Sequence, residues 1–434
     1  MSVSRFVRPI FFWIHLSIGL LAGALILLMS ITGVLLGFER QMIAWIDGAP
    51  RVEVTGEPAL PLDSLLARVA VARADLASAV VKRDATQPVT LRLRERGAAP
   101  ILAHPVTGEI LTASGDGSGQ RFFSAMRRWH RWVGAQGAEL RAQMKVLNGV
   151  ANLVFLALVL SGLYLWWPRH WTIQRLRATT LPQWHRAGKA RDFNWHNALG
   201  FWFAIPLALI VATAAFISFR WPGQYLDLAL GSEQERAAAR VAIAEARAAR
   251  AATDAAPNVA NVANPAPARP AAVADSAPRQ ELVRSDDAPL AQYVAAAAAA
   301  HPAWAQLTIT MPDAKANLTR IAVAEGNTYR PDLRWTLDLD RASAVVATAS
   351  GYDDLSAARK IRAWVRFGHT GEVFGIPGQI LATIASAVGV LLVWTGFALA
   401  WRRWLNWLRR RRRRSVPAVA ALPDATLESP TALR

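Results

Sequence analysis

Four histidines stand at or close to the beginnings of four long apolar segments, and three of them share one local spacing. In these three, a glycine follows four residues later, so histidine and glycine lie on one face of a helix. A flat ligand could bond the imidazole and rest against the backbone where glycine has no side chain. Such a helix can hold haem. The histidines are His15, His130, His196 and His369, and the glycines that follow the first three are Gly19, Gly134 and Gly200.

A single histidine of this kind would also suit an interfacial aromatic belt. Ionisable groups at membrane depth are costly, however, and those that occur there are usually functional. This chain places one histidine in the same relation to each of its four apolar segments. The repeated placement favours a ligand role for the whole set.

The apolar segments cover residues 9–38, 146–167, 193–219 and 376–401. Each reaches the length of about 20 residues that a helix needs to cross a bilayer. The first segment is long and lacks a small-residue cleavage site, which favours a retained anchor over a removed signal peptide. We therefore expect an integral membrane protein with four transmembrane helices.

Basic residues in the short segments predict the orientation in the lipid bilayer. The connection 168–192 holds six basic residues against one acidic residue, and the C-terminal segment contains an unbroken arginine run at 409–414. By the positive-inside rule both are cytoplasmic, and so are the N- and C-termini. The two long segments, 39–145 and 220–375, then lie outside the cytoplasm.

The net charge of +18 is concentrated in these flanks and at the outer membrane surface, so anionic lipid headgroups explain much of it without nucleic acid. The sequence contains no nucleic-acid-binding motif. It also contains no cysteine, which excludes disulfides, catalytic thiols, thiolate-ligated iron–sulfur clusters and haem attached through Cys-x-x-Cys-His. Any redox chemistry must use a cofactor held by histidine or held without protein ligands.

The two halves of the chain repeat one order of apolar span, soluble domain, histidine-bearing segment and apolar span. Each soluble domain starts with helical apolar spacing and continues with three β-like runs, the last of which contains a turn. The predicted helices are 59–72 and 289–300, and the predicted strands are 79–82, 89–94, 101–112, 306–311, 318–324 and 334–349. The expected fold is an α-helical membrane protein of four spans in two parallel repeats, with two small α+β domains of one helix and a three-stranded sheet each.

Eight segments follow from these boundaries. They are the N-terminal tail and first span (1–38), the first outer domain (39–118), an outer histidine segment with the second span (119–167), a basic cytoplasmic loop (168–192), the third span (193–219), the second outer domain (220–358), another outer histidine segment with the fourth span (359–401), and an arginine-rich cytoplasmic tail (402–434). Residues 230–287 break the symmetry as an Ala-, Arg- and Pro-rich insertion, whose first part could be helical and whose part from 256 onward cannot bury a core. We interpret it as a tethered insertion without a catalytic role, with a docking arm for a partner as the alternative.

Three motifs carry a resemblance to a known family. They are Thr-Gly-Glu-Ile-Leu at 107–111, Arg-Trp-His-Arg-Trp-Val-Gly at 128–134 and Ser-Gly-Leu-Tyr-Leu-Trp-Trp-Pro at 161–168. With the order of the elements, they make the chain resemble the PepSY-associated transmembrane family over nearly its whole length except the insertion. The resemblance points to the iron-uptake branch of that family, whose members include ferric-siderophore reductases.

The resemblance implies a bacterial inner-membrane protein with PepSY-like periplasmic domains and haem b. It places the four family histidines at His15, His130, His196 and His369. The sequence departs from the family pattern at His369, which is followed by Thr-Gly-Glu, and in the low-complexity insertion.

Topology pairs the histidines independently of the family. The spans that begin at His15 and His196 start in the cytoplasm, whereas His130 and His369 precede spans that start outside. Each pair comes from equivalent positions in the two halves, and each could clamp one six-coordinate haem between helices. Since a helix of about 20 residues climbs roughly 30 Å, two haems would divide the membrane into shorter electron hops.

Arginines flank the outer pair. Arg127, Arg131 and Arg366 are candidates for haem propionates, because guanidinium groups bind carboxylates bidentately; lipid headgroups are the alternative partner. The remaining histidines, His104, His170, His185 and His301, are interpreted as loop or interfacial residues.

Electrons delivered outside need an acceptor, and a ferric siderophore is chemically suitable because divalent iron is held more weakly by oxygen ligands. The donor would be quinol or an unknown cytoplasmic reductase, since no Gly-rich dinucleotide fingerprint follows a strand. Two alternatives remain open: a cytochrome b-like oxidoreductase with another periplasmic acceptor, and a non-enzymatic module that binds or regulates a peptidase. A transporter is disfavoured, because the helices lack mid-membrane charges and broken segments.

Overall fold

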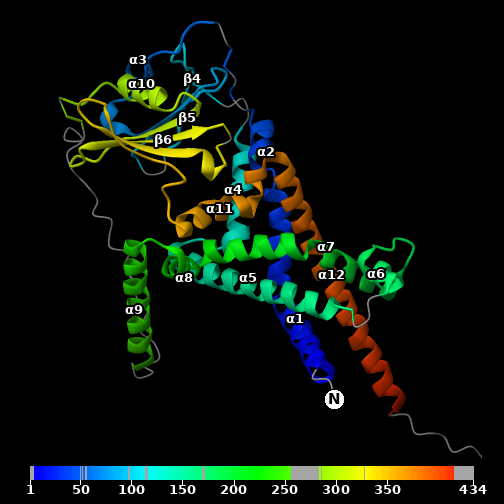
Figure 1. Cartoon of the computed structure of the whole chain (residues 1–434). Coiled ribbons are helices and arrows are strands. Elements are labelled where there is room, and N and C mark those ends of the chain that lie inside the picture. The colour runs from blue at the N-terminus through cyan, green and yellow to red at the C-terminus, as the bar shows by residue number, and fades with distance from the viewer. Residues whose placement is uncertain are drawn as a thin grey trace, which may run out of the picture.

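The computed structural model describes residues 4–414 except 49, 51, 54–55, 96–97, 113–115, 169–171, 256–282, 285 and 327. Long helices form one part of the molecule, and an antiparallel sheet lies at one end of them (Figure 1). The Pro-rich part of the predicted insertion falls mostly outside the described residues. Its first part is helical, as the sequence allowed, and forms α9 (Glu233–Ala255).

The described residues include four helices long and apolar enough to cross a membrane, which confirms the four predicted spans. They are α1 (Ser4–Leu36), α5 (Ala138–Trp166), α7 (Gly188–Ser218) and α12 (Gly375–Arg414). Large apolar side chains on their outer faces are exposed: 84% of Leu21, 72% of Ile205 and 65% of Trp394. Apolar surface of this kind suits contact with lipid. The chain is a multi-pass membrane protein.

Each long helix contacts two of the others. Helix α1 contacts α5 and α12, and α7 also contacts α5 and α12, while the α5–α7 pair crosses the α1–α12 pair (Figure 1). Small residues allow the close approach of α1 and α12: a Cβ atom on Gly23 would lie 2.5 Å from Cζ of Phe397, and one on Gly389 would lie 2.8 Å from Oγ of Ser30. Small residues at helix contacts are typical of membrane bundles.

Polar contacts bring four helix ends to one side of the bundle. Arg8 near the start of α1 donates to the backbone oxygen of Trp167 at the end of α5 (3.3 Å). Arg402 near the end of α12 pairs with Asp192 near the start of α7 (2.6 Å). The sheet domain lies at the opposite end, where α1 finishes and α12 begins (Figure 1). The start of the chain, the connection 168–192 and the end of α12 therefore share one side.

The strands form one eight-stranded antiparallel sheet in the order β4-β3-β2-β1-β5-β6-β7-β8. They are β1 (Leu76–Lys82), β2 (Val89–Leu93), β3 (Ile101–Ala103), β4 (Ile110–Leu111), β5 (Trp304–Thr310), β6 (Leu318–Glu325), β7 (Arg334–Asp340) and β8 (Val346–Ser350). This differs from the expected pair of separate three-stranded sheets. The last predicted run of each half is divided by its turn into two strands. The first strands of the two halves, β1 and β5, pair with each other, with Ala79 opposite Ile309.

One hydrophobic core serves both halves of the sheet. Helices α3 (Leu62–Val69) and α10 (Leu290–Ala300) lie on the sheet face that points away from the long helices (Figure 1). Side chains from both halves are fully buried there, among them Leu65, Leu91, Tyr293 and Leu337. The two outer segments therefore fold as a single domain.

Shorter helices complete the described chain. They are α2 (Glu39–Ile46), α4 (Ser118–Trp132), α6 (Ile173–Thr180), α8 (Trp221–Leu230) and α11 (Ala357–Thr370), with 3₁₀ turns at Arg73–Asp75, Pro331–Leu333 and Glu372–Phe374. Helices α4 and α11 directly precede the long helices α5 and α12, so they occupy the predicted outer histidine segments.

A carboxylate of the first half caps a helix of the second half. Asp63 on α3 accepts the backbone N–H groups of Leu290 and Ala291 at 3.0 and 2.9 Å. We expect Asp63→Ala to destabilise the sheet domain by about 0.5–2 kcal/mol, because two N–H groups at the start of α10 lose their acceptor. Hydrogen exchange of the α10 amides measures this loss. Asp313→Ala is the control, since this exposed carboxylate only approaches Arg94 (3.8 Å). Equal exchange in the two variants would contradict the prediction.

Candidate functional site

The structure brings His15 on α1 beside His196 on α7. Their ring centroids lie 6.4 Å apart, with an angle of 87° between the planes. Both side chains are half-buried between the long helices. The pair lies toward the side where the start of the chain and the end of α12 meet. We call these residues the inner pair.

The structure also brings His130 on α4 beside His369 on α11. Their ring centroids are again 6.4 Å apart, and the planes are inclined by 56°. This outer pair lies toward the sheet-domain end of the bundle. The polar residues 136–145 separate His130 from its apolar span, and residues 138–145 of this stretch form the first turns of α5. The ring of His130 nevertheless reaches the bundle, because α4 packs against α1.

Every one of the four rings has its Nδ1 atom near a hydroxyl group on a neighbouring helix. The Nδ1–oxygen distances are 2.9 Å from His15 to Ser161, 2.9 Å from His196 to Thr395, 2.9 Å from His130 to Thr32 and 3.2 Å from His369 to Thr213. The Nδ1 atom of His369 is also 2.9 Å from the backbone oxygen of Ile210. Sequence reasoning did not identify these hydroxyl residues. A signal was present, because three of them are followed by glycine.

Two polar side chains hold α4, which carries His130, at its two ends. The buried carboxylate of Asp47 accepts the backbone N–H groups of Gly119 and Gln120, both at 2.8 Å. A carboxylate is favourable there because helix N-termini carry unpaired N–H groups and a partial positive charge. At the other end, the amide of Asn148 on α5 donates to the backbone oxygen of His130 at 2.8 Å. The position of His130 is therefore fixed from α2 and α5.

Burial keeps the outer imidazoles neutral. It lowers the pKa of His130 to about 4, and the nearby His369 adds to the shift. Burial also lowers the pKa of His369. Both rings are therefore uncharged at pH 7, the form in which imidazole binds a metal.

The spacing of each pair fits a six-coordinate metal between two imidazoles. With metal–nitrogen bonds of about 2 Å on each side and five-membered rings of ordinary bond lengths, the ring centroids would be roughly 6.3 Å apart. The observed separation is 6.4 Å in both pairs. Within the described part of the chain, no group of three or more His, Asp or Glu side chains is arranged to hold a bare ion. Haem iron needs only two axial ligands from the protein, so a two-histidine site suits it.

The predicted glycines have other neighbours than expected. A Cβ atom on Gly19 would meet Leu158 of α5 at 3.6 Å, and one on Gly200 would meet Leu392 of α12 at 3.7 Å, so both lie at helix–helix contacts. Gly134 has a φ of +78° in the turn that ends α4, a conformation that favours glycine.

Different glycines lie against the rings. A Cβ atom on Gly162 would lie 3.3 Å from Cε1 of His15, and one on Gly396 would lie 3.7 Å from Cε1 of His196. A Cβ atom on Gly33 would lie 3.7 Å from Cε1 of His130. Each of these glycines lies on the helix that supplies the hydroxyl group near Nδ1 of the same ring, and it directly follows that hydroxyl residue in the sequence. A flat ligand would therefore meet a glycine on the helix opposite each of these three histidines.

The predicted arginines differ in their surroundings. The charge of Arg131 acts on both outer histidines. Arg127 forms an ion pair with Glu39 and also donates to Ser124 (2.8 Å). The guanidinium of Arg366 lies 5.8 Å from the ring centroid of Phe367. Of the three, Arg131 is the best placed to meet an anion at the outer pair.

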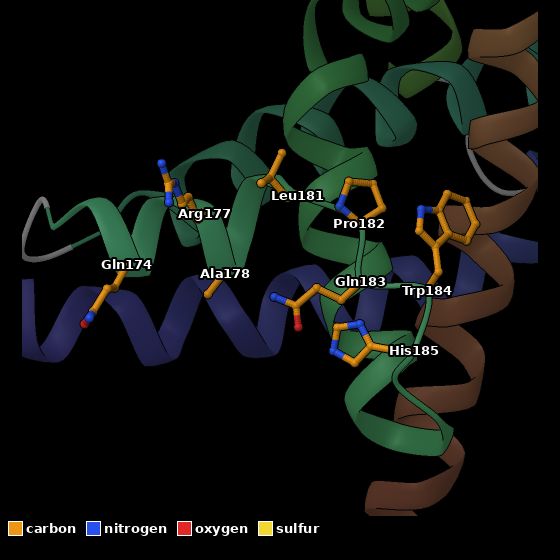
Figure 2. A pocket seen from close by; sticks show the side chains of 8 residues that line it. All are labelled: Gln174, Arg177, Ala178, Leu181, Pro182, Gln183, Trp184 and His185. Atoms are coloured by element: carbon orange, nitrogen blue, oxygen red, sulfur yellow. The ribbon is translucent and has the colours of Figure 1, made fainter.

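The other described histidines take no part in the pairs. His104 accepts the backbone N–H groups of Val106 and Thr107, and His301 contacts Glu325. His185 lines an open hollow of about 700 Å³ on the connection between α6 and α7, together with Leu181 and Trp184 (Figure 2). None of the four paired histidines lines that hollow. His170 lies outside the described residues.

The cap on α4 can be tested separately from the cap on α11. We expect Asp47→Ala to accelerate hydrogen exchange in the first turn of α4 by roughly 5- to 30-fold, which corresponds to a loss of about 1–2 kcal/mol. The matched variant is Ser356→Ala, which removes the side chain that caps α11 by accepting from the N–H of Arg359 (3.2 Å). That variant should accelerate exchange in α11 and leave α4 unchanged. Unchanged exchange in α4 of the Asp47 variant would show that the carboxylate does not hold this helix.

The family comparison covers the whole site. The model for the PepSY-associated TM region matches residues 12–403, which include all four histidines and their hydroxyl partners. Among curated proteins, none matches the chain. The match over most of the chain confirms the family that the sequence motifs suggested. The chain belongs to the family of proteins defined by the PepSY-associated TM region.

Proposed function

We propose that this protein carries electrons across a bacterial inner membrane through two b-type haems and reduces ferric siderophores on the periplasmic side. This would place it in the iron-uptake branch of its family. The observation that carries the proposal is the pair of two-histidine sites with the same 6.4 Å spacing. One haem would lie between His15 and His196 and the other between His130 and His369. When bound, haem supplies reversible one-electron chemistry.

The arrangement of charges supports an orientation. Positive charge is concentrated in the connection 168–192 and in the last turns of α12, on the side of the bundle that also holds the start of α1. Cytoplasmic segments are enriched in Lys and Arg, so this side would be the cytoplasm and both termini would be cytoplasmic. The sheet domain would then be periplasmic.

Matching intervals support a duplication. On α1, His15 and the hydroxyl residue Thr32 are 17 residues apart, and on α7, His196 and Thr213 are also 17 residues apart. Each helix thus carries a ring for one site and a hydroxyl group for the other. Parallel repeats of this kind are known in membrane folds. We propose that α1, α4 and α5 correspond to α7, α11 and α12.

The protein's own residues would bind and orient the two cofactors. The four imidazoles would ligate iron, and the apolar helices around them would exclude water. Arg131 would pair with a propionate at the outer site. An interval of 17 residues corresponds to about 25 Å along a helix, so the two sites would span most of the hydrocarbon core.

A ferric siderophore is the acceptor that the chemistry favours. Each bound ferric ion takes one electron, and the resulting divalent ion is held more weakly by oxygen ligands, so iron leaves the intact chelator. Electrons would reach the inner pair from quinol or from a separate cytoplasmic reductase. The sequence contains no dinucleotide fingerprint of its own.

Spectra of histidine variants test the two-site arrangement. Purified protein should hold about two haems per chain by the pyridine haemochrome assay. His15→Ala and His196→Ala should remove one and the same component of the reduced-minus-oxidised spectrum, and His130→Ala and His369→Ala should remove the other. His104→Ala and His301→Ala are the controls and should keep both components. A colourless protein from haem-replete cells would instead favour a peptidase-binding role, and loss of one component by both His15→Ala and His130→Ala would disprove the pairing.

Vesicles test the acceptor and the direction. With the cofactors reduced chemically, an externally added ferric siderophore should reoxidise them, and a ferrous chelator should trap the released iron. The His130 and His369 variants should keep the inner component reducible but lose at least about tenfold in rate, because removing the outer site breaks the path. Chelate reduction at the parent rate in both variants would show that the outer pair is not on the path. Failure of the parent protein with siderophores but not with other oxidants would indicate a different periplasmic acceptor.

A further inference from the structure

The hydroxyl groups beside the histidines have their own hydrogen atoms committed elsewhere. Thr32 donates to the backbone oxygen of Leu28 at 2.7 Å, and Thr395 donates to that of Leu391 at 2.7 Å. Ser161 donates to the backbone oxygen of Leu158 at 3.2 Å. Each acceptor belongs to the preceding turn of the same helix. This is the usual hydrogen bond of Ser and Thr in the middle of a helix.

A hydroxyl group has one hydrogen and two lone pairs. When its hydrogen is bound to a helix carbonyl, it can only accept from the imidazole. The proton of each neutral ring must then be on Nδ1, and the lone pair must be on Nε2.

We propose that Thr32, Ser161 and Thr395 are positioning residues that hold Nε2 of His130, His15 and His196 deprotonated and aimed at the cofactor. The inference rests on the proposed function, since it assigns these hydroxyl groups to haem ligation. Partners of this kind commonly fix the tautomer and orientation of ligand histidines. Each of the long helices α1, α5 and α12 supplies one such hydroxyl.

The fourth histidine provides an internal comparison. Nδ1 of His369 is 2.9 Å from the backbone oxygen of Ile210 and 3.2 Å from the hydroxyl of Thr213. The hydroxyl of Thr213 donates to the backbone oxygens of Leu209 and Ile210, both at 2.8 Å. Since the carbonyl oxygen already accepts from the ring, His369 keeps its tautomer without the hydroxyl group. Thr213 is therefore dispensable for ligation, unlike its three counterparts.

The test replaces each hydroxyl group at nearly constant volume in the full-length protein. Thr32→Val, Thr395→Val and Ser161→Ala should lower haem affinity at the affected site by about 10- to 100-fold, measured by transfer to excess apomyoglobin. Thr32→Val should affect the spectral component and midpoint potential of the outer site only, and the other two variants those of the inner site only. Thr213→Val should change affinity by about threefold or less, because the carbonyl bond remains. Thr32→Ser and Thr395→Ser should retain the parent behaviour.

Two results would overturn the inference. One is parent-like affinity and potential in all three variants. The other is an equal loss of haem affinity in Thr213→Val, which would assign the effect to helix packing.

Haem-free protein with ¹⁵N-labelled histidine separates this inference from the proposed function. Its neutral rings should show protonated Nδ1 in the parent, and Thr32→Val should alter the tautomer of His130. Absence of haem from the parent would refute the proposed function and with it the assignment of these hydroxyl groups to haem ligation. A parent that binds haem but has protonated Nε2 in its haem-free form would refute the positioning role alone.

Discussion

A neutral imidazole buried between apolar helices must give its one N–H to an acceptor and leave its other nitrogen bare. Four rings face this requirement, and a neighbouring helix meets it each time, with a hydroxyl group for three rings and with the backbone oxygen of Ile210 for His369. Helix α1 is bound in this way to α5 at one end and to α4 at the other. Helix α7 is bound likewise to α12 and α11. The same few contacts therefore set both the orientation of the rings and the neighbours of each helix.

The outer rings need additional support, because α4 and α11 are short and lie at the end of the bundle. Asp47 and Asn148 hold the two ends of α4. Beyond the end of α11, the half-turn that leads into α12 contains the buried Glu372, which pairs with Arg40 of α2 at 3.3 Å. Helix α9 contributes Glu235, whose carboxylate pairs with Arg359 of α11. The helical part of the low-complexity insertion thus braces an element that carries a site residue.

Local pattern predicted much of this architecture. Apolar runs gave the four spans, and the positions of the histidines relative to those runs brought His15 beside His196 and His130 beside His369. The residues that sequence reasoning missed depend on contacts between distant segments. A threonine such as Thr32 inside an apolar span is an ordinary polar residue until the helix beside it is known. The ion pair between Glu39 and Arg127 was missed for the same reason.

The pairing of β1 with β5 also could not be predicted from local pattern, because the periodicity of a strand does not identify the strand with which it pairs. This pairing has a consequence for synthesis of the chain. More than 220 residues separate the two strands along the chain, from Lys82 to Trp304, including the connection to the other side of the bundle. Until β5 is made, β1 is an open edge with unpaired N–H and C=O groups, the kind of edge at which strands of different molecules associate. During synthesis, the edge of β1 therefore stays unpaired while two further helices enter the membrane. In a chain truncated after the third span, this edge would remain free to pair with strands of other molecules.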